Sequence, residues 1–194
     1  MKNILVLVSA IFFLSLQFVI AGAIKGKIKT KDEALKNVVV YLESIEKAAY
    51  QPPKEAAVMD QINLNFVPHV LPVLIGTKVI FPNSDKIRHS VFSVSKVKKF
   101  DFGTYTPGVE KSIICDQAGV IPILCYIHHD MSAYIVVLNT PYFVLTNDAG
   151  EFYLDEVPAG KYHLKFWNEE IEIKSEEIVI PVKGTLTKNL NVVD

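Results

Sequence analysis

The chain lacks an excess of charge of either sign, and it has few cysteines. Its 194 residues carry 20 lysines and arginines against 21 aspartates and glutamates, so the formal net charge is −1. A protein that binds a polyanion usually carries a basic excess that neutralises phosphates, so we expect no nucleic-acid partner. Two cysteines are too few for a small scaffold held together by disulfides. Half of the residues are hydrophobic, which excludes an intrinsically disordered chain.

Helical periodicity is also scarce. Beyond residue 23, no stretch longer than about two turns repeats its apolar residues every 3.6 positions. Short runs of β-branched, aromatic or alternating residues, such as 38–42 and 161–167, are separated by turns that contain glycine or proline. The pattern predicts an all-β protein built from sandwiches or barrels.

Residues 1–23 predict an export signal. Lys2 precedes an apolar run over residues 4–20, and Ala21-Gly22-Ala23 offers the small residues that signal peptidase accepts. A retained membrane anchor is the alternative, but the run of about 17 residues is short for a spanning helix and polar residues interrupt it. We expect cleavage, a periplasmic or otherwise exported mature chain, and no membrane span in that chain.

Sulfur and imidazole are concentrated in residues 125–131. Cys125, His128 and Met131 follow one another at intervals of three in a chain with five histidines and three methionines. Apolar, strand-like runs over residues 120–124 and 133–138 enclose them, so they lie on a short loop. A thiolate with two imidazoles and a weak axial thioether is the donor set of a blue-copper site. The sequence therefore predicts copper ligands here.

The second imidazole has to come from another part of the chain. His89 is the best candidate, because it lies between a strand with its loop, residues 79–88, and the strand-like run 90–95. We expect His89, Cys125, His128 and Met131 to form one copper site at one end of a sandwich. No second histidine cluster or Ser/His/Asp set stands out in the sequence, so we predict that the chain is not an enzyme.

Cys125 has two alternative roles, an inert buried thiol or one half of a disulfide with Cys115. An exported compartment favours the disulfide. Residues 111–115 and 120–126, however, resemble the arms of a hairpin, which would place Cys115 opposite Val120 and out of reach of Cys125. We therefore expect a copper thiolate at position 125 and a free buried thiol at position 115.

The segments 76–85 and 125–131, with His89 between them, resemble the plastocyanin/azurin cupredoxins, and the ligand loop is most similar to those of amicyanin and pseudoazurin. Residues 59–93 extend the likeness to the exported bacterial cupredoxins often called methylamine utilization proteins. The resemblance implies a Greek-key β-sandwich, the four copper ligands named above, and one-electron transfer to a redox partner protein through His128. Cupredoxins usually carry Asn after the first ligand, where Ser90 stands here, a difference that bears on the reduction potential.

A second resemblance covers the two ends of the chain. Residues 26–42 and 146–164 resemble the carboxypeptidase regulatory-like domain, whose corresponding pieces are nearly adjacent. We therefore expect a cupredoxin domain inserted in a small Ig-like sandwich. The expected boundaries are 1–23 for the signal, 24–57 and 140–194 for the regulatory-like parts, and 58–139 for the cupredoxin.

Other features keep two readings. We expect His69 to pack at a strand end rather than to bind metal, and His129 to be exposed. A basic cluster flanks His89 in the sequence and predicts either a docking face for an acidic partner or a solvated edge: Lys86, Arg88, Lys96, Lys98 and Lys99. We expect a monomer. Copper storage or delivery, and a non-redox interaction module, are the alternative functions.

Overall fold

The computed structural model describes residues 21–31, 33–45 and 49–192. Strands and no helix occur in these ranges, which confirms the all-β prediction. Within the same ranges no helix is long and apolar enough to cross a membrane. The predicted signal falls on residues 1–20, which lie outside the described residues, and on residues 21–23, which begin the first strand.

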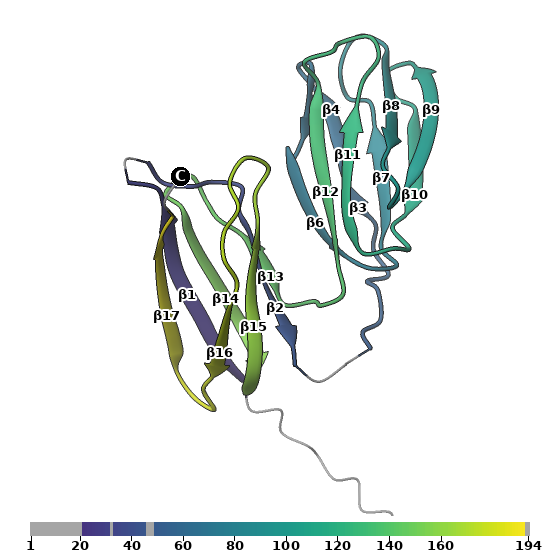
Figure 1. Cartoon of the computed structure of the whole chain (residues 1–194). Coiled ribbons are helices and arrows are strands. Elements are labelled where there is room, and N and C mark those ends of the chain that lie inside the picture. The colour runs from purple at the N-terminus through teal and green to yellow at the C-terminus, as the bar shows by residue number, and fades with distance from the viewer. Residues whose placement is uncertain (1–20, 32, 46–48, 193–194) are drawn as a thin grey trace, which may run out of the picture.

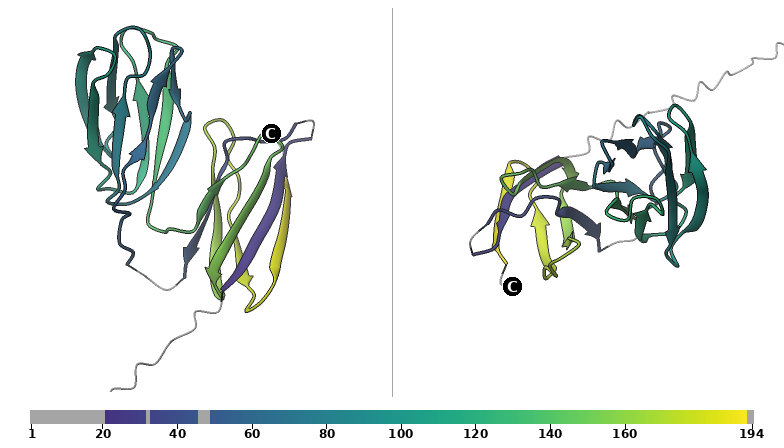
Figure 2. Two further views of the ribbon diagram at one scale, coloured as in Figure 1. Left: turned by 180° about the vertical axis from the view of Figure 1, so that it is seen from behind. Right: turned by 90° about the horizontal axis from the view of Figure 1, so that it is seen from above.

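The strands form two β-sandwiches that lie side by side (Figures 1 and 2). In chain order they are β1 (Ala21–Lys29), β2 (Val39–Ser44), β3 (Ala57–Val58), β4 (Asp60–Ile62), β5 (Asn65–Val67), β6 (Val70–Leu74), β7 (Lys78–Pro82), β8 (His89–Val94), β9 (Lys99–Tyr105), β10 (Glu110–Ile114), β11 (Gly119–Leu124), β12 (Ser132–Leu138), β13 (Phe143–Leu145), β14 (Glu151–Pro158), β15 (Gly160–Trp167), β16 (Glu176–Ile180) and β17 (Thr185–Asn191).

Strands β3 to β12 make the central sandwich. One sheet has the order β10-β7-β3, the other has the order β6-β12-β11-β8-β9, and β4 and β5 form a separate hairpin. Alternate residues of each strand face the space between the sheets, where Phe81, Val91, Ile121 and Ile135 are fully buried. This packed core holds the loops at both ends of the sandwich.

Strands β1, β2 and β13 to β17 make the flanking sandwich, so both ends of the described chain contribute to it. Its sheets have the orders β14-β1-β17 and β13-β2-β15-β16. Strand β1 pairs antiparallel with β14 and parallel with β17, so it is the central strand of its sheet. The likeness of this sandwich to the regulatory-like domain stays a prediction.

The predicted hairpin over residues 111–126 is wrong. Strand β10 pairs with β7 in one sheet, whereas β11 pairs with β12 and β8 in the other. Ile113 and Cys115 both face the core, so the chain continues through the edge of the sandwich and crosses to the opposite sheet. Cys115 is fixed at the end of the sandwich by the amide of Gly76, which donates to its carbonyl at 2.7 Å. Both cysteines are nevertheless free, as predicted.

His69 connects the two sandwiches, a role that the sequence did not indicate. Its Nδ1 lies 3.1 Å from the carbonyl oxygen of Ser132, at the start of β12. Its Nε2 lies 2.8 Å from the carboxylate of Glu169, in the loop after β15 of the flanking sandwich. The pair lies beside an aromatic contact between Tyr134 and Trp167, whose ring centroids are 5.2 Å apart. The flanking sandwich is therefore held against the central one.

Substitution of Gly26 tests the packing of the flanking sandwich. A Cβ atom at this position would collide with the carbonyl oxygen of Lys188 in β17 and would lie 2.8 Å from the ring of Phe152 in β14. We expect Gly26→Ala to lower the free energy of unfolding by on the order of 3 kcal/mol, because the backbones of three strands would have to separate. Chemical denaturation measures this loss.

The matched control is Gly160→Ala in β15. A Cβ atom at Gly160 meets only the ring of Tyr162, at an ordinary 3.7 Å, so we expect a change of less than about 1 kcal/mol. Equal losses for the two variants would contradict the register of β1 with its neighbours.

Candidate metal centre

Three of the predicted ligands converge at one end of the central sandwich. His89 begins β8, while Cys125 and His128 lie on the loop that joins β11 to β12. Strands β8 and β11 are neighbours, with Phe92 opposite Leu124, so the loop returns to the same end as His89. The ligand atoms of His89, Cys125 and His128 all lie within 4.8 Å of one another. Segments more than thirty residues apart therefore build one cluster.

The ligand atoms are sheltered from water to different degrees. The side chain of His89 is fully buried, Cys125 is 4 % exposed, and His128 is half-buried. Met131 is 2 % exposed and belongs to the same core cluster as Cys125. Its amide donates to the carbonyl of His128 at 3.0 Å, which closes the loop tightly. The thioether is available to this site, and its role as a ligand stays a prediction.

The two histidines face each other through the same ring nitrogen. Nδ1 of His89 lies 3.0 Å from Nδ1 of His128. Two imidazole nitrogens at this distance cannot both present lone pairs to an empty space, because the lone pairs repel. Either one ring donates a proton to the other or both nitrogens bind one cation, and the thiol beside them would suit a soft cation.

Asp85 fixes the orientation of His89, and the sequence analysis missed it. Its Oδ2 lies 3.0 Å from Nε2 of His89. Backbone amides of Leu64 and Lys86 donate to the same carboxylate and, as the main causes, lower the pKa of Asp85. The ionised carboxylate accepts a hydrogen bond from the N–H group at Nε2 of His89. The other ring nitrogen, Nδ1, then presents its lone pair to the cluster. Metal-bound histidines commonly have such a carboxylate partner. The available signal was an acidic residue four positions before His89.

Hydrogen bonds favour the anionic form of the Cys125 sulfur. Burial alone would raise the pKa of the Cys125 thiol, but hydrogen bonds from the backbones of His128, Ser90 and Ile127 and from the Ser90 hydroxyl lower it below the ordinary 9.0. The hydroxyl oxygen of Ser90 is 3.6 Å from the sulfur and accepts from the amide of Tyr126 at 2.7 Å. Burial raises the pKa of Cys115 to about 11, so the two thiols differ in chemistry.

The remaining predicted residues do not join the cluster. His129 is exposed, as expected, and lies outside the group that could hold a metal. Strand β8 separates the basic residues that flank His89 in the sequence. Lys86 and Arg88 precede the strand at the end of the metal cluster, and Lys96, Lys98 and Lys99 follow it at the opposite end. Lys98, one of the latter, forms an ion pair with Asp116 at 2.9 Å. The basic residues therefore do not form one face.

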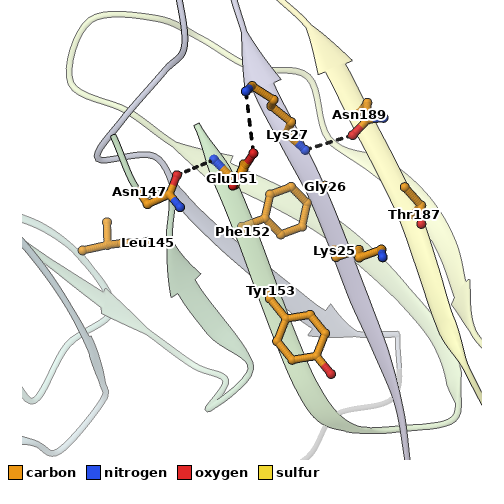
Figure 3. Close-up of a pocket in the computed structure, with 10 residues that line it drawn as sticks. All are labelled: Lys25, Gly26, Lys27, Leu145, Asn147, Glu151, Phe152, Tyr153, Thr187 and Asn189. Atoms are coloured by element: carbon orange, nitrogen blue, oxygen red, sulfur yellow. Dashed lines mark hydrogen bonds and ion pairs between the residues drawn. The ribbon is translucent and has the colours of Figure 1, made fainter. Parts of the chain in front are cut away.

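A separate hollow of about 620 Å³ lies on the flanking sandwich (Figure 3). Four of its polar residues are bonded in pairs. Lys27 pairs with Glu151 at 3.7 Å and donates its amide to Asn189 at 3.0 Å, while Asn147 accepts from the amide of Glu151. They therefore do not converge on a ligand. Among the described residues, the one cluster suited to a metal is the group of His89, Cys125 and His128.

No protein-family model matches the chain, and no curated protein matches it either. Among solved structures, it is similar to a purple cupredoxin from Nitrosopumilus maritimus, with 18% identity over 42% of this chain and 99% of that one and a TM-score of 0.40. It is also similar to an amicyanin variant in the reduced state, with 19% identity over 50% of this chain and 99% of the amicyanin chain, and a TM-score of 0.40. A copper-containing nitrite reductase (NirK) from Thermus scotoductus SA-01 shows 22% identity, coverages of 50% and 26%, and a TM-score of 0.43.

Replacement of Ser90 tests how the thiol is prepared. In the metal-free protein, Ser90→Ala removes one hydrogen bond to the sulfur and leaves the amide of Tyr126 without its acceptor. We expect the pKa of Cys125 to rise relative to the wild type, and the free energy of unfolding to fall by about 1–3 kcal/mol. The rate of thiol alkylation as a function of pH measures the first effect.

The free energy of unfolding of the metal-free protein should depend on pH through the ionisation of the Cys125 thiol. The pKa of the Cys125 thiol lies below 9.0 in the folded state and at the ordinary 9.0 in the unfolded state. As the pH rises between these two pKa values, the thiol loses its proton in the folded state first. The free energy of unfolding therefore rises with pH in this window, and Ser90→Ala flattens the rise. The control is Ser93→Ala, a buried serine of the same strand whose hydroxyl accepts from the amide of Ser95. A flattened rise in both variants would contradict the role given to Ser90.

Proposed function

We propose that the chain is a type 1 copper protein that carries single electrons. The observation that supports this most directly is the convergence of one buried cysteine and two histidines, with their ligand atoms within 4.8 Å of one another. Thiolate and imidazole are donors that copper prefers, and this trigonal set with a weak thioether is typical of electron-transfer sites. His89, Cys125 and His128 would hold the ion, and the buried Met131 would be the weak axial ligand.

Bound copper supplies a Cu(II)/Cu(I) couple, which gains or loses one electron. The protein contributes ligands that are already in place. Asp85 holds the ring of His89, Ser90 holds the loop at Cys125, and the amide of Met131 closes the turn at His128. A site fixed in this way has little to rearrange between the two oxidation states, which suits an electron carrier more than a protein that releases the ion.

We also propose where the electron enters and leaves. His89 is fully buried, whereas His128 is half-buried and lies beside the exposed side chains of Tyr126 and Ile127. His128 is thus the ligand closest to solvent, and a redox partner protein would approach over it. The signal-like sequence of residues 1–23 supports a periplasmic or otherwise exported site of action, where such a partner would be found.

The two cysteines provide a matched test of copper binding. We expect the purified chain to bind one equivalent of copper and to show intense visible absorption from charge transfer between sulfur and copper, with a matching EPR spectrum. Cys125→Ser should abolish the absorption, because the hydroxyl is not a soft anionic donor. Cys115→Ala should retain it, because Cys115 is buried at the opposite end of the sandwich with its pKa raised to about 11.

Other results would assign a different function. Absorption that survives Cys125→Ser, or the absence of copper binding, would reject the electron carrier and favour an interaction module. Normal spectra with rapid loss of copper to a chelator and no reversible redox couple would instead indicate copper storage or delivery.

The carboxylate beside His89 gives a second prediction. Asp85→Asn keeps an oxygen that can accept the hydrogen bond from Nε2 of His89, but it removes the negative charge that favours binding of the copper ion. We expect the affinity for Cu(II) to fall by about 10–100-fold, as measured by competition with a chelator of known affinity. The control is Asp116→Asn, an exposed carboxylate at the other end of the sandwich that pairs with Lys98. Equal effects of both variants would show that Asp85 acts only through net charge.

A further inference from the structure

Four strands of the five-stranded sheet, β6, β12, β11 and β8, carry apolar residues on both faces of the sheet. Its inner face packs into the core through residues such as Val91, Ile123 and Ile135. Its outer face carries the alternate residues, and the register places Phe92 of β8 beside Leu124 of β11. An outer face that met only water would carry polar residues at these positions. This face therefore has something to cover it.

The flanking sandwich covers one half of the outer face. Val70 of β6 with Val136 and Leu138 of β12 are buried there. They pack against residues of the flanking sandwich, which are Val39, Tyr41, Phe143, Leu145 and Trp167. Figure 1 shows β6 nearest the flanking sandwich and β9 farthest from it. The contact between the two sandwiches thus ends partway across the sheet.

The other half of the same face remains uncovered. Val94 of β8 is 68 % exposed and Tyr126, just after β11, is 51 % exposed. The ring of Tyr126 stacks on Phe92 with centroids 3.7 Å apart and planes 4° from parallel, and its hydroxyl donates to Asp101 at 3.1 Å. The aromatic surface is therefore fixed in place before anything binds to it. We call Phe92, Val94, Leu124 and Tyr126 the open patch.

Charges of opposite sign lie along one edge of the open patch, on strand β9. On the edge strand β9, Lys99 stands opposite Val94 and Asp101 stands opposite Phe92. Side chains of paired residues share a face, so the positive charge borders the patch at Val94 and the negative charge borders it at Phe92. A copy of the patch that faces it with its strands reversed would place each lysine over an aspartate.

We propose that the open patch is the interface of a dimer of two copies of this chain, related by a two-fold axis that runs across the strands. The apolar centre would be shared, and Lys99 of each copy would meet Asp101 of the other, as an isologous interface requires. The patch continues a sheet-on-sheet contact that this chain already makes between its own two sandwiches. The proposal replaces the expected monomer, and it does not depend on copper.

Sedimentation velocity of the metal-free full chain over a wide range of concentrations tests the proposal. We expect a reversible shift from monomer to dimer as the concentration rises. Val94→Glu should raise the dimer dissociation constant by about tenfold or more, because it replaces an apolar contact with one charge from each copy in the interface. Val179→Glu is the matched control, since Val179 is 60 % exposed on β16 of the flanking sandwich, and it should leave the constant unchanged.

The two charges along the edge of the patch test the two-fold geometry. Lys99→Glu and Asp101→Lys should each weaken self-association, because each places like charges together twice. An equimolar mixture of the two variants should associate more tightly than either alone, since both contacts become attractive in the mixed dimer. A wild-type chain that stays monomeric at every concentration would overturn the proposal and leave the patch to a different protein. Equal effects of Val94→Glu and Val179→Glu would overturn it as well.

Discussion

The hydroxyl of Ser90 joins the two segments on which the metal centre depends. It accepts from the amide of Tyr126 at 2.7 Å and lies 3.6 Å from the sulfur of Cys125. Ser90 follows His89 directly, so this contact fixes the distance between the first imidazole and the ligand loop. The pairing of β8 with β11 brings the two segments to one end of the sandwich, and the Ser90 contact joins them next to Cys125.

The two sandwiches contribute differently to the molecule. The central one supplies a closely packed core that holds the predicted ligands at one end and the buried thiol of Cys115 at the other. The flanking one covers part of the outer sheet face and reaches His69 through Glu169. Because His69 also bonds the carbonyl of Ser132, next to Met131, the flanking sandwich is connected to the strand that follows the ligand loop.

Local patterns in the sequence were sufficient for the fold class, but not for the pairing of strands. The spacing of Cys125, His128 and Met131 and the position of His89 predicted a metal site, and the structure brings the ligand atoms of His89, Cys125 and His128 within 4.8 Å of one another. Alternation reveals which residues share a face but not which strand lies beside another, so the hairpin over residues 111–126 was wrong. Asp85 escaped notice because an aspartate in a loop is ordinary until the fold places it beside Nε2 of His89. The members of the basic cluster lie at both ends of β8, which their closeness in the sequence does not reveal.

The central claim is that one sulfur and two imidazoles bind a single copper ion together. Copper K-edge X-ray absorption of the loaded chain tests this most directly, because it reports the atoms bound to the metal whatever the protein does with it. The account predicts one sulfur at a short distance together with two imidazole nitrogens. A first shell of nitrogen and oxygen alone, with no sulfur, would contradict it.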